Sequence, residues 1–291
     1  MSTLAADNIG ETRESRFCGL LRRTRDDRRS LIGLVIIIAI VLMASVGAAL
    51  WPYDPTTADF ARTLLPPNRL NWFGTDELGR DILARILVGA RVSLLVGAVS
   101  VGVALVVGTA IGLVAGYVGG AIDGVLMRLM DVLFAFPSIL LALAITAVLG
   151  PSLQNAILAI AVVYVPVFAR MARAQTLVVR EMNYVEAMRA MGMHEGRIMV
   201  GTVLPNILPP LLVLGSLLFA SAIITESYLS FLGLGIQPPD PSWGNMLKNA
   251  IGFLGEAPWM AWFPGVAIFL AVLGFNLCGD GLRDRLDPRD Q

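Results

Sequence analysis

The chain has 291 residues, of which 56% are hydrophobic and only 15% are charged, whereas about a quarter of an average soluble domain is charged. Its 22 basic and 22 acidic residues cancel, so the charge balance gives no indication of nucleic-acid binding. The composition therefore indicates an integral membrane protein.

The sequence lacks the patterns of a nucleotide or metal site. Its one lysine, Lys248, follows Gly244-Asn245-Met246-Leu247, which is not the turn ending in Gly-Lys-Ser/Thr that a P-loop requires. With His194 as the only histidine, neither a His-based metal centre nor a Ser-His-Asp triad is supported. We therefore expect no enzyme activity, no catalytic residues and no cofactor in this chain, with His194 in an exposed loop.

The N-terminal part predicts a cytosolic tail followed by a membrane anchor. Residues 1–30 are polar and rich in arginine, and the uncharged run 31–51 can cross about 30 Å of hydrocarbon as a helix. The run is too long for the apolar core of a cleaved signal peptide, and further spans follow it, so an uncleaved anchor is favoured. The positive-inside rule places the tail in the cytosol and Trp51 on the far side.

An extracytoplasmic segment completes a first unit, residues 31–88. It contains several prolines and then Gly74-Thr75-Asp76-Glu77-Leu78-Gly79-Arg80-Asp81, in which Thr75 is predicted to cap a helix. Apolar residues then recur at helical spacing: Ile82, Leu83, Ile86 and Leu87. This pattern predicts a short amphipathic helix at the membrane surface, although a packed outer helix fits equally well.

Five further spans follow. Residues 92–122 give one tilted span rich in small residues, which allow close helix packing, with a turn at 116–120. Residues 132–169 exceed one span, so Gly150-Pro151 is predicted to divide them, with kinks at Pro137 and Pro166. Just before them, the spacing of Arg128 and Asp131 favours a salt bridge. Residues 198–225 and about 257–279 give the last two spans.

This count predicts an all-α protein with six transmembrane helices and both termini in the cytosol, including the tail 281–291. The polar interruption at residues 170–197, the most densely charged one after the N-terminus, then also lies in the cytosol. Five arginines mark it: Arg170, Arg173, Arg180, Arg189 and Arg197. Because this cluster and the N-terminal arginines both obey the positive-inside rule, they support one topology.

Within the interruption, residues 184–191 are mostly helix formers, and Gly192 is a natural stop. Val185, Met188 and Gly192 share one face of this short helix. Such a helix suits a groove on a partner protein, but it could equally rest on lipid headgroups. The residues alone leave these two interpretations open.

The same segment resembles the signature loop of ABC-importer permeases. The loop has the pattern Glu-Ala-Ala, three residues, Gly, nine residues, an apolar position, any residue, and Leu-Pro. The matching residues are Glu186, Ala187, Gly192, Leu204 and Pro205, while Met188 replaces an alanine and Thr202 an isoleucine. The resemblance implies a coupling helix at about 184–197, including Tyr184 and Arg189, that docks on an ATP-binding subunit.

Further blocks are similar to the dipeptide/oligopeptide permease family, and specifically to its second, C-type permease subunit. They include Gly89-Ala90-Arg91-Val92-Ser93-Leu94, Ala135-Phe136-Pro137, Leu229-Ser230-Phe231-Leu232-Gly233-Leu234-Gly235, Pro241-Ser242-Trp243-Gly244 and Gly279-Asp280-Gly281-Leu282-Arg283-Asp284. The resemblance implies a type I ABC-importer transmembrane domain at 89–280, with five of the six helices. It also implies a bacterial cytoplasmic (inner) membrane location.

The resemblance further implies the partners: a sister permease, one or two ABC ATPase subunits that bind ATP, and an extracytoplasmic solute-binding protein that contacts segments 52–90 and 227–256. Glu226, expected just outside the fifth span, could line the translocation pathway, cap a helix or pair with an outer charge. The solute could be a dipeptide or oligopeptide, glutathione or a nickel complex. A secondary transporter is the rival class, but the spans lack ionisable residues and an inverted repeat.

Overall fold

The computed structural model describes residues 28–286, so the predicted tail 1–30 lies largely outside the described residues, as do residues 287–291 of the tail 281–291. Within that range the regular structure is helical, apart from one isolated bridge between Thr75 and Asp81. The α-helices are α2 (Arg28–Leu42), α3 (Ala48–Leu50), α4 (Ile82–Val118), α5 (Gly120–Phe134), α6 (Ser138–Leu149), α7 (Leu153–Val179), α8 (Asn183–Ala190), α9 (Glu195–Ile198), α10 (Leu204–Phe231), α11 (Trp243–Ala250) and α12 (Trp259–Leu286). Short 3-10 helices occur at Phe60–Arg62 and Ile251–Phe253, and π-helical turns at Met43–Gly47 and Met199–Val203.

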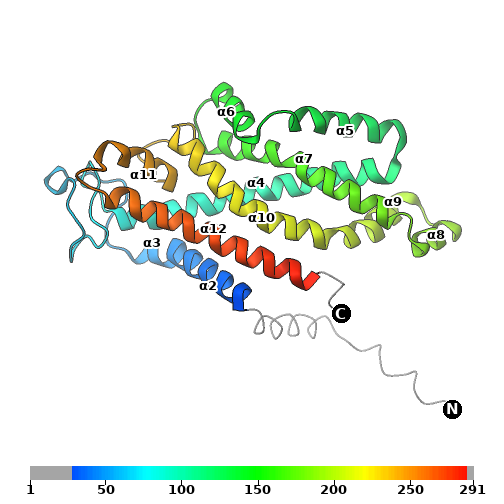
Figure 1. Cartoon of the computed structure of the whole chain (residues 1–291), viewed down its shortest axis with the longest axis horizontal. Coiled ribbons are helices and arrows are strands. Elements are labelled where there is room, and N and C mark those ends of the chain that lie inside the picture. Colours follow the sequence, from blue (N-terminus) through cyan, green and yellow to red (C-terminus); the bar gives the residue numbers. More distant parts are fainter. Residues whose placement is uncertain (1–27, 287–291) are drawn as a thin grey trace, which may run out of the picture.

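The long helices run roughly along one axis, with α11 and the 52–81 loops at one end and α8 at the other (Figure 1). Five helical stretches of the described chain are long and apolar enough to cross a membrane: Arg28–Leu50, Ile82–Val118, Leu153–Val179, Glu195–Phe231 and Trp259–Asp284. The pair α5–α6 supplies a sixth if it is counted as one span, because its two helices are bent by 87° at a short break. The predicted multi-span helical fold is confirmed, but its third span is broken at Pro137 rather than kinked.

Close packing of α4 on α7 forms the centre of the bundle. A Cβ atom on Gly108 would lie 2.6 Å from the Phe168 Cβ, and one on Gly112 would lie 2.2 Å from the Ala169 carbonyl oxygen. Neither glycine could be replaced without moving the α7 backbone or its side chains. The small residues predicted to permit close helix approach therefore do so along this seam.

The remaining long helices pack around this centre. The α2 and α12 helices lie side by side, as shown by Gly33, where a Cβ atom would lie 2.8 Å from the backbone nitrogen of Cys278. Helix α10 contacts both α12 and α4, and the Phe219 and Phe275 rings stack at 4.0 Å between centroids. Residues 28–286 thus form one connected bundle.

At the end of the bundle that carries α11, the predicted surface helix is wrong. The helix from Ile82 continues without interruption to Val118, and its first turn is capped by Asp81, whose carboxylate accepts a hydrogen bond from the Ala84 N–H at 2.7 Å. Thr75, the predicted cap, is instead buried in the preceding loop. Ile82 and Ile86 pack against residues near α11 and the start of α12, so the apolar face that suggested lipid contact is covered by protein.

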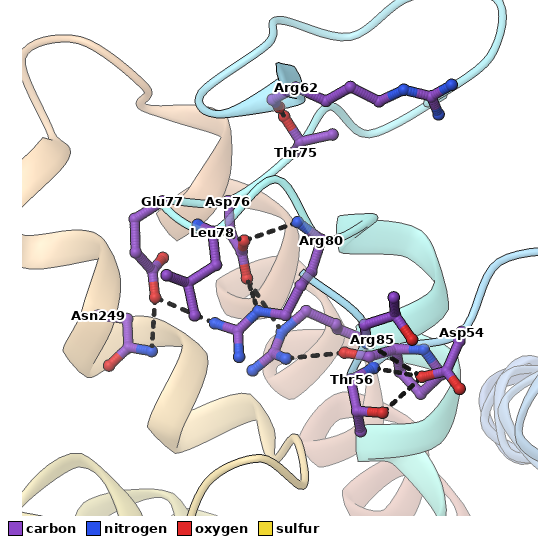
Figure 2. A network of polar contacts seen from close by, with 12 residues as sticks. Asp54, Thr56, Arg62, Thr75, Asp76, Glu77, Leu78, Arg80, Arg85 and Asn249 are labelled. Atoms are coloured by element: carbon purple, nitrogen blue, oxygen red, sulfur yellow. Dashed lines mark hydrogen bonds and ion pairs between the residues drawn. The ribbon is translucent and has the colours of Figure 1, made fainter. Parts of the chain in front are cut away.

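A buried ion cluster fixes the loop to α4 (Figure 2). Asp76 pairs with Arg80 at 2.6 Å and with Arg85 at 3.4 Å, and the Arg85 side chain is only 2% exposed. Arg80 also pairs with Glu77 at 3.0 Å, and Asn249 of α11 donates to the same Glu77 oxygen. Each guanidinium therefore has a carboxylate partner, which offsets the cost of removing these charges from water.

Helix α11 was not expected within the outer segment. Ser242 caps it by accepting a hydrogen bond from the Asn245 N–H at 3.2 Å. Trp243 is 1% exposed, and its indole N–H donates to the Ile86 carbonyl of α4 at 3.1 Å. The helix therefore joins α4 and α10 into one rigid outer end.

The predicted salt bridge between Arg128 and Asp131 is also wrong. Asp131 pairs with Arg170 of α7 at 2.8 Å, and Arg170 lies 3.9 Å above the Phe134 ring. Asp123, near the start of α5, forms a bidentate pair with Arg173 of α7, at 2.5 and 2.6 Å. Contacts between helices thus replace the local pair, and they fix α5 along α7.

Candidate functional site

The short helix predicted in the polar interruption is present as α8, at the end of the bundle opposite α11 (Figure 1). Its Val185 side chain is completely buried, whereas Glu186, Ala187 and Arg189 are exposed and Tyr184 is 42% exposed. One buried residue and a small, polar outer face leave most of this helix open to a partner. The predicted coupling residues on α8 therefore share an accessible surface.

Gly192 ends this helix as expected. Its φ of +77° lies in the left-handed region, which glycine adopts without steric cost. The Gly192 N–H donates to the Arg189 carbonyl at 2.9 Å, and the Met193 N–H donates to the Met188 carbonyl at 3.1 Å. This is the Schellman pattern of helix termination, and it turns the chain sharply toward α9.

Helix α8 is connected to α9 and α4 by a three-residue contact. The Tyr117 hydroxyl, in the last turn of α4, donates to the Glu195 carboxylate of α9. Arg189 of α8 pairs with the same carboxylate at 3.4 Å and lies 5.5 Å from the centroid of the Tyr117 ring. We call Tyr117, Arg189 and Glu195 the α8 clamp, because they join three elements at this end of the bundle.

The two departures from the permease pattern contact each other. The Thr202 hydroxyl donates to the Met188 sulfur at 3.4 Å, across the turn between α8 and α10. A smaller alanine at 188 would not reach this hydroxyl. The two residues that depart from the permease pattern, Met188 and Thr202, therefore contact each other in the structure.

The other predicted residues lie apart from α8. Leu204 and Pro205 begin α10, where Leu204 is half-buried against the core and Pro205 is exposed. His194 is exposed, as expected, and its Nδ1 caps α9 by accepting from the Gly196 N–H at 3.2 Å. The Glu186–Pro205 motif thus covers a helix, its sharp end and the return into α10.

Glu226 does not lie just outside a span, as expected, but inside a helix. Helix α10 continues to Phe231, so Glu226 lies within it, and only 1% of its side chain is exposed. Its carboxylate accepts hydrogen bonds from Ser230 at 2.6 Å and from Ser93 of α4 at 3.3 Å. These hydroxyl groups replace the outer-loop charge that was considered as a partner, and a place in the pathway stays a prediction.

Sequence reasoning missed Tyr117 and the pairing of Asp123 with Arg173. Their partners are distant in sequence and belong to other helices. The signal available was limited to a tyrosine and an acidic residue beside the predicted turn at 116–120. Such residues indicate a helix end but do not identify what it contacts.

Two family comparisons cover most of the chain. Residues 108–289 match the binding-protein-dependent transport system inner membrane component, and residues 18–67 match the N-terminal transmembrane domain of oligopeptide transport permease C. The chain belongs to the binding-protein-dependent transport permeases. It is therefore a transmembrane permease subunit of an ABC importer, a multi-pass protein of the inner membrane.

Individual relatives extend over nearly the whole of this permease. It is 47% identical to a dipeptide transport system permease protein of Alkalihalophilus pseudofirmus, over 92% of this chain and 88% of that protein. It is 42% identical to a probable D,D-dipeptide transport system permease protein of Escherichia coli, over 95% and 94%. A glutathione transport system permease protein of Salmonella typhimurium is 46% identical, over 92% and 89%.

A solved structure shares the fold of this permease. A chain of the MetNI methionine ABC transporter, in an inward-facing form, aligns with a TM-score of 0.57. The alignment covers 69% of this chain and 96% of that chain, at 20% identity. It supports the expected type I ABC-importer fold and says nothing of the solute.

Proposed function

We propose that this permease carries dipeptides and short oligopeptides across the cytoplasmic membrane, together with a sister permease as a heterodimer. ATP is bound and hydrolysed by separate ATPase subunits, and no cofactor binds to this chain. A solute-binding protein delivers the peptide to the outer segments 52–90 and 227–256. The single observation that carries the coupling part of this proposal is the exposed outer face of α8 at one end of the bundle.

In this proposal α8 enters a groove on an ATPase subunit, and both termini lie with it in the cytosol. Glu186 projects from the exposed face and contacts the groove. Val185, which is fully buried, fixes the other side of α8 to the permease. A displacement of α8 then moves α4 through the α8 clamp and α10 through the Met188–Thr202 contact.

The coupling role can be tested with Glu186→Ala in the complete importer, reconstituted in liposomes with its binding protein and ATPases. Because Glu186 has no role in packing the bundle, we expect normal assembly but more ATP hydrolysed for each peptide imported. Asp284→Ala removes an exposed carboxylate near the end of α12, outside the segments assigned to the ATPase and to the binding protein, and is the matched control. An unchanged ratio of hydrolysis to uptake in Glu186→Ala would refute a coupling role for Glu186.

One relative is named as a D,D-dipeptide permease and another as a glutathione permease, and the second name makes glutathione another candidate solute. Uptake of radiolabelled dialanine and of radiolabelled glutathione should be measured separately, the former also in the presence of an unlabelled tripeptide. A peptide permease is expected to show competition by the tripeptide. Uptake of glutathione without uptake of dialanine would replace the peptide proposal by the glutathione one.

A further inference from the structure

The break between α5 and α6 is the main irregularity in the transmembrane part of the described chain. The helices meet at 87°, and residues 135–137 between them continue neither helix. These residues are exposed on the surface of the chain, and Phe136 is 56% exposed. They lie beside Val163 and Tyr164, which are near the middle of α7, so the break is at membrane depth rather than at the membrane surface.

Lipid cannot cover such a break cheaply. In hydrocarbon every backbone N–H and C=O must find an internal partner, and irregular backbone is tolerated only inside protein or beside a water-filled cavity. Pro137 provides no side-chain cap for α6, and the first-turn N–H groups of a helix have no partner within it. These donors therefore require water, protein or a solute.

A cavity of about 540 Å³ opens at this break. Residues 133–138 and Leu141 line one side, and Val163, Tyr164 and Val167 of α7 line the other. The volume lies within the range of small-molecule sites, roughly 300–1,000 Å³. No lining residue is charged, and the side-chain hydroxyls are those of Ser138 and Tyr164, the latter held 3.2 Å from the Thr225 hydroxyl of α10.

We propose that this cavity lies on the solute pathway and that its lining residues form the part of the pathway wall contributed by this permease. The cavity holds a short peptide with its water of hydration. The inference rests on the proposed function for the identity of the peptide. The first-turn N–H groups of α6 are donors suited to a terminal carboxylate, because helix N-termini favour anions. The apolar remainder of the wall makes no charged contact and so accepts peptides with different side chains.

Accessibility of single cysteines tests the proposal. Cys18 and Cys278 are first replaced by alanine, and Ser138→Cys and Val167→Cys are then made singly in the complete importer. Val106→Cys is the matched control, because Val106 is 69% exposed within the uncharged part of α4 and does not line the cavity. The probe is a charged methanethiosulfonate that requires water to reach its target. Binding-protein-stimulated ATP hydrolysis confirms that each variant is assembled.

We expect the two cavity cysteines to react about tenfold or more faster than Val106→Cys, because a charged reagent is strongly excluded from hydrocarbon. Dialanine supplied with the binding protein should slow both reactions. Rates equal to that of Val106→Cys would overturn the proposal and show that lipid or the sister permease covers the break. Fast reactions that dialanine does not slow would retain the water-filled wall but overturn the peptide as its occupant, whereas the proposed solute itself fails only if the importer does not take up dialanine.

Discussion

Replacement of Gly192 by alanine isolates the contribution of one backbone angle to coupling. A Cβ atom at this position would meet no atom within 4 Å, so the substitution creates no clash. The cost comes from the φ of +77°, and the left-handed conformation costs a residue with a Cβ about 1–2 kcal/mol. A difference of this size changes a conformational ratio roughly 5- to 30-fold, so the sharp end of α8 becomes correspondingly less populated.

The matched control is Gly201→Ala, because a Cβ at Gly201 also meets nothing within 4 Å, and Gly201 does not have a positive φ. Gly192→Asn is the conservative variant, since asparagine tolerates the left-handed region better than alanine. ATP hydrolysis and peptide uptake are measured together in proteoliposomes. We expect Gly192→Ala to import less peptide for each ATP, Gly192→Asn to recover part of the loss, and Gly201→Ala to match the parent protein. Equal ratios for the two alanine variants would refute the reasoning.

Two further predictions concern the two ends of the bundle. Arg85→Met removes one of the two arginine partners of the buried Asp76, which keeps Arg80, and should destabilise the protein by about 1–3 kcal/mol, seen as a lower thermal unfolding temperature. Arg62→Met removes an exposed pair, in which the Arg62 side chain is 40% exposed, and should cost less than about 1 kcal/mol; equal shifts would contradict the buried role of Arg85. Tyr117→Phe removes one hydrogen bond of the α8 clamp, worth about 0.5–1.5 kcal/mol, and should raise the ATP hydrolysed per imported peptide. Uptake and hydrolysis that remain coupled in Tyr117→Phe would exclude a transmitting role for this hydroxyl.

The spans could be predicted from the sequence because charge is excluded from hydrocarbon over long, uninterrupted stretches. The helix ends at 116–120, Gly150 and Gly192 could also be predicted, and the structure gives positive φ angles to Gly119, Gly150 and Gly192. These features are local: each depends on a glycine and its immediate neighbours. The exposed face of α8 followed from the same kind of pattern.

Features that depend on distant partners could not be predicted in this way. Arg85 has the spacing of a polar residue on the exposed face of a surface helix. In the structure its guanidinium is buried, pairs with Asp76 and donates a hydrogen bond to the Pro55 carbonyl. Asp131 has an arginine three residues away and yet pairs with Arg170, because α5 lies along α7. The apolar spacing from Ile82 cannot distinguish lipid from protein as the covering partner. Sequence periodicity identifies a buried face without identifying what buries it.

The contacts also determine how a movement of α8 would be distributed. The α8 clamp joins α8 to the end of α4, and close glycine contacts join α4 to α7. The Asp123–Arg173 and Asp131–Arg170 pairs join α5 to α7, so α4, α5 and α7 should move together. The chain bends by 87° between α5 and α6, but α6 also packs against α7, and the buried ion cluster around Asp76 holds the start of α4. A force applied at α8 is therefore transmitted to α4, α5 and α7 as one group, and so reaches both the α5 side and the Tyr164 side of the cavity.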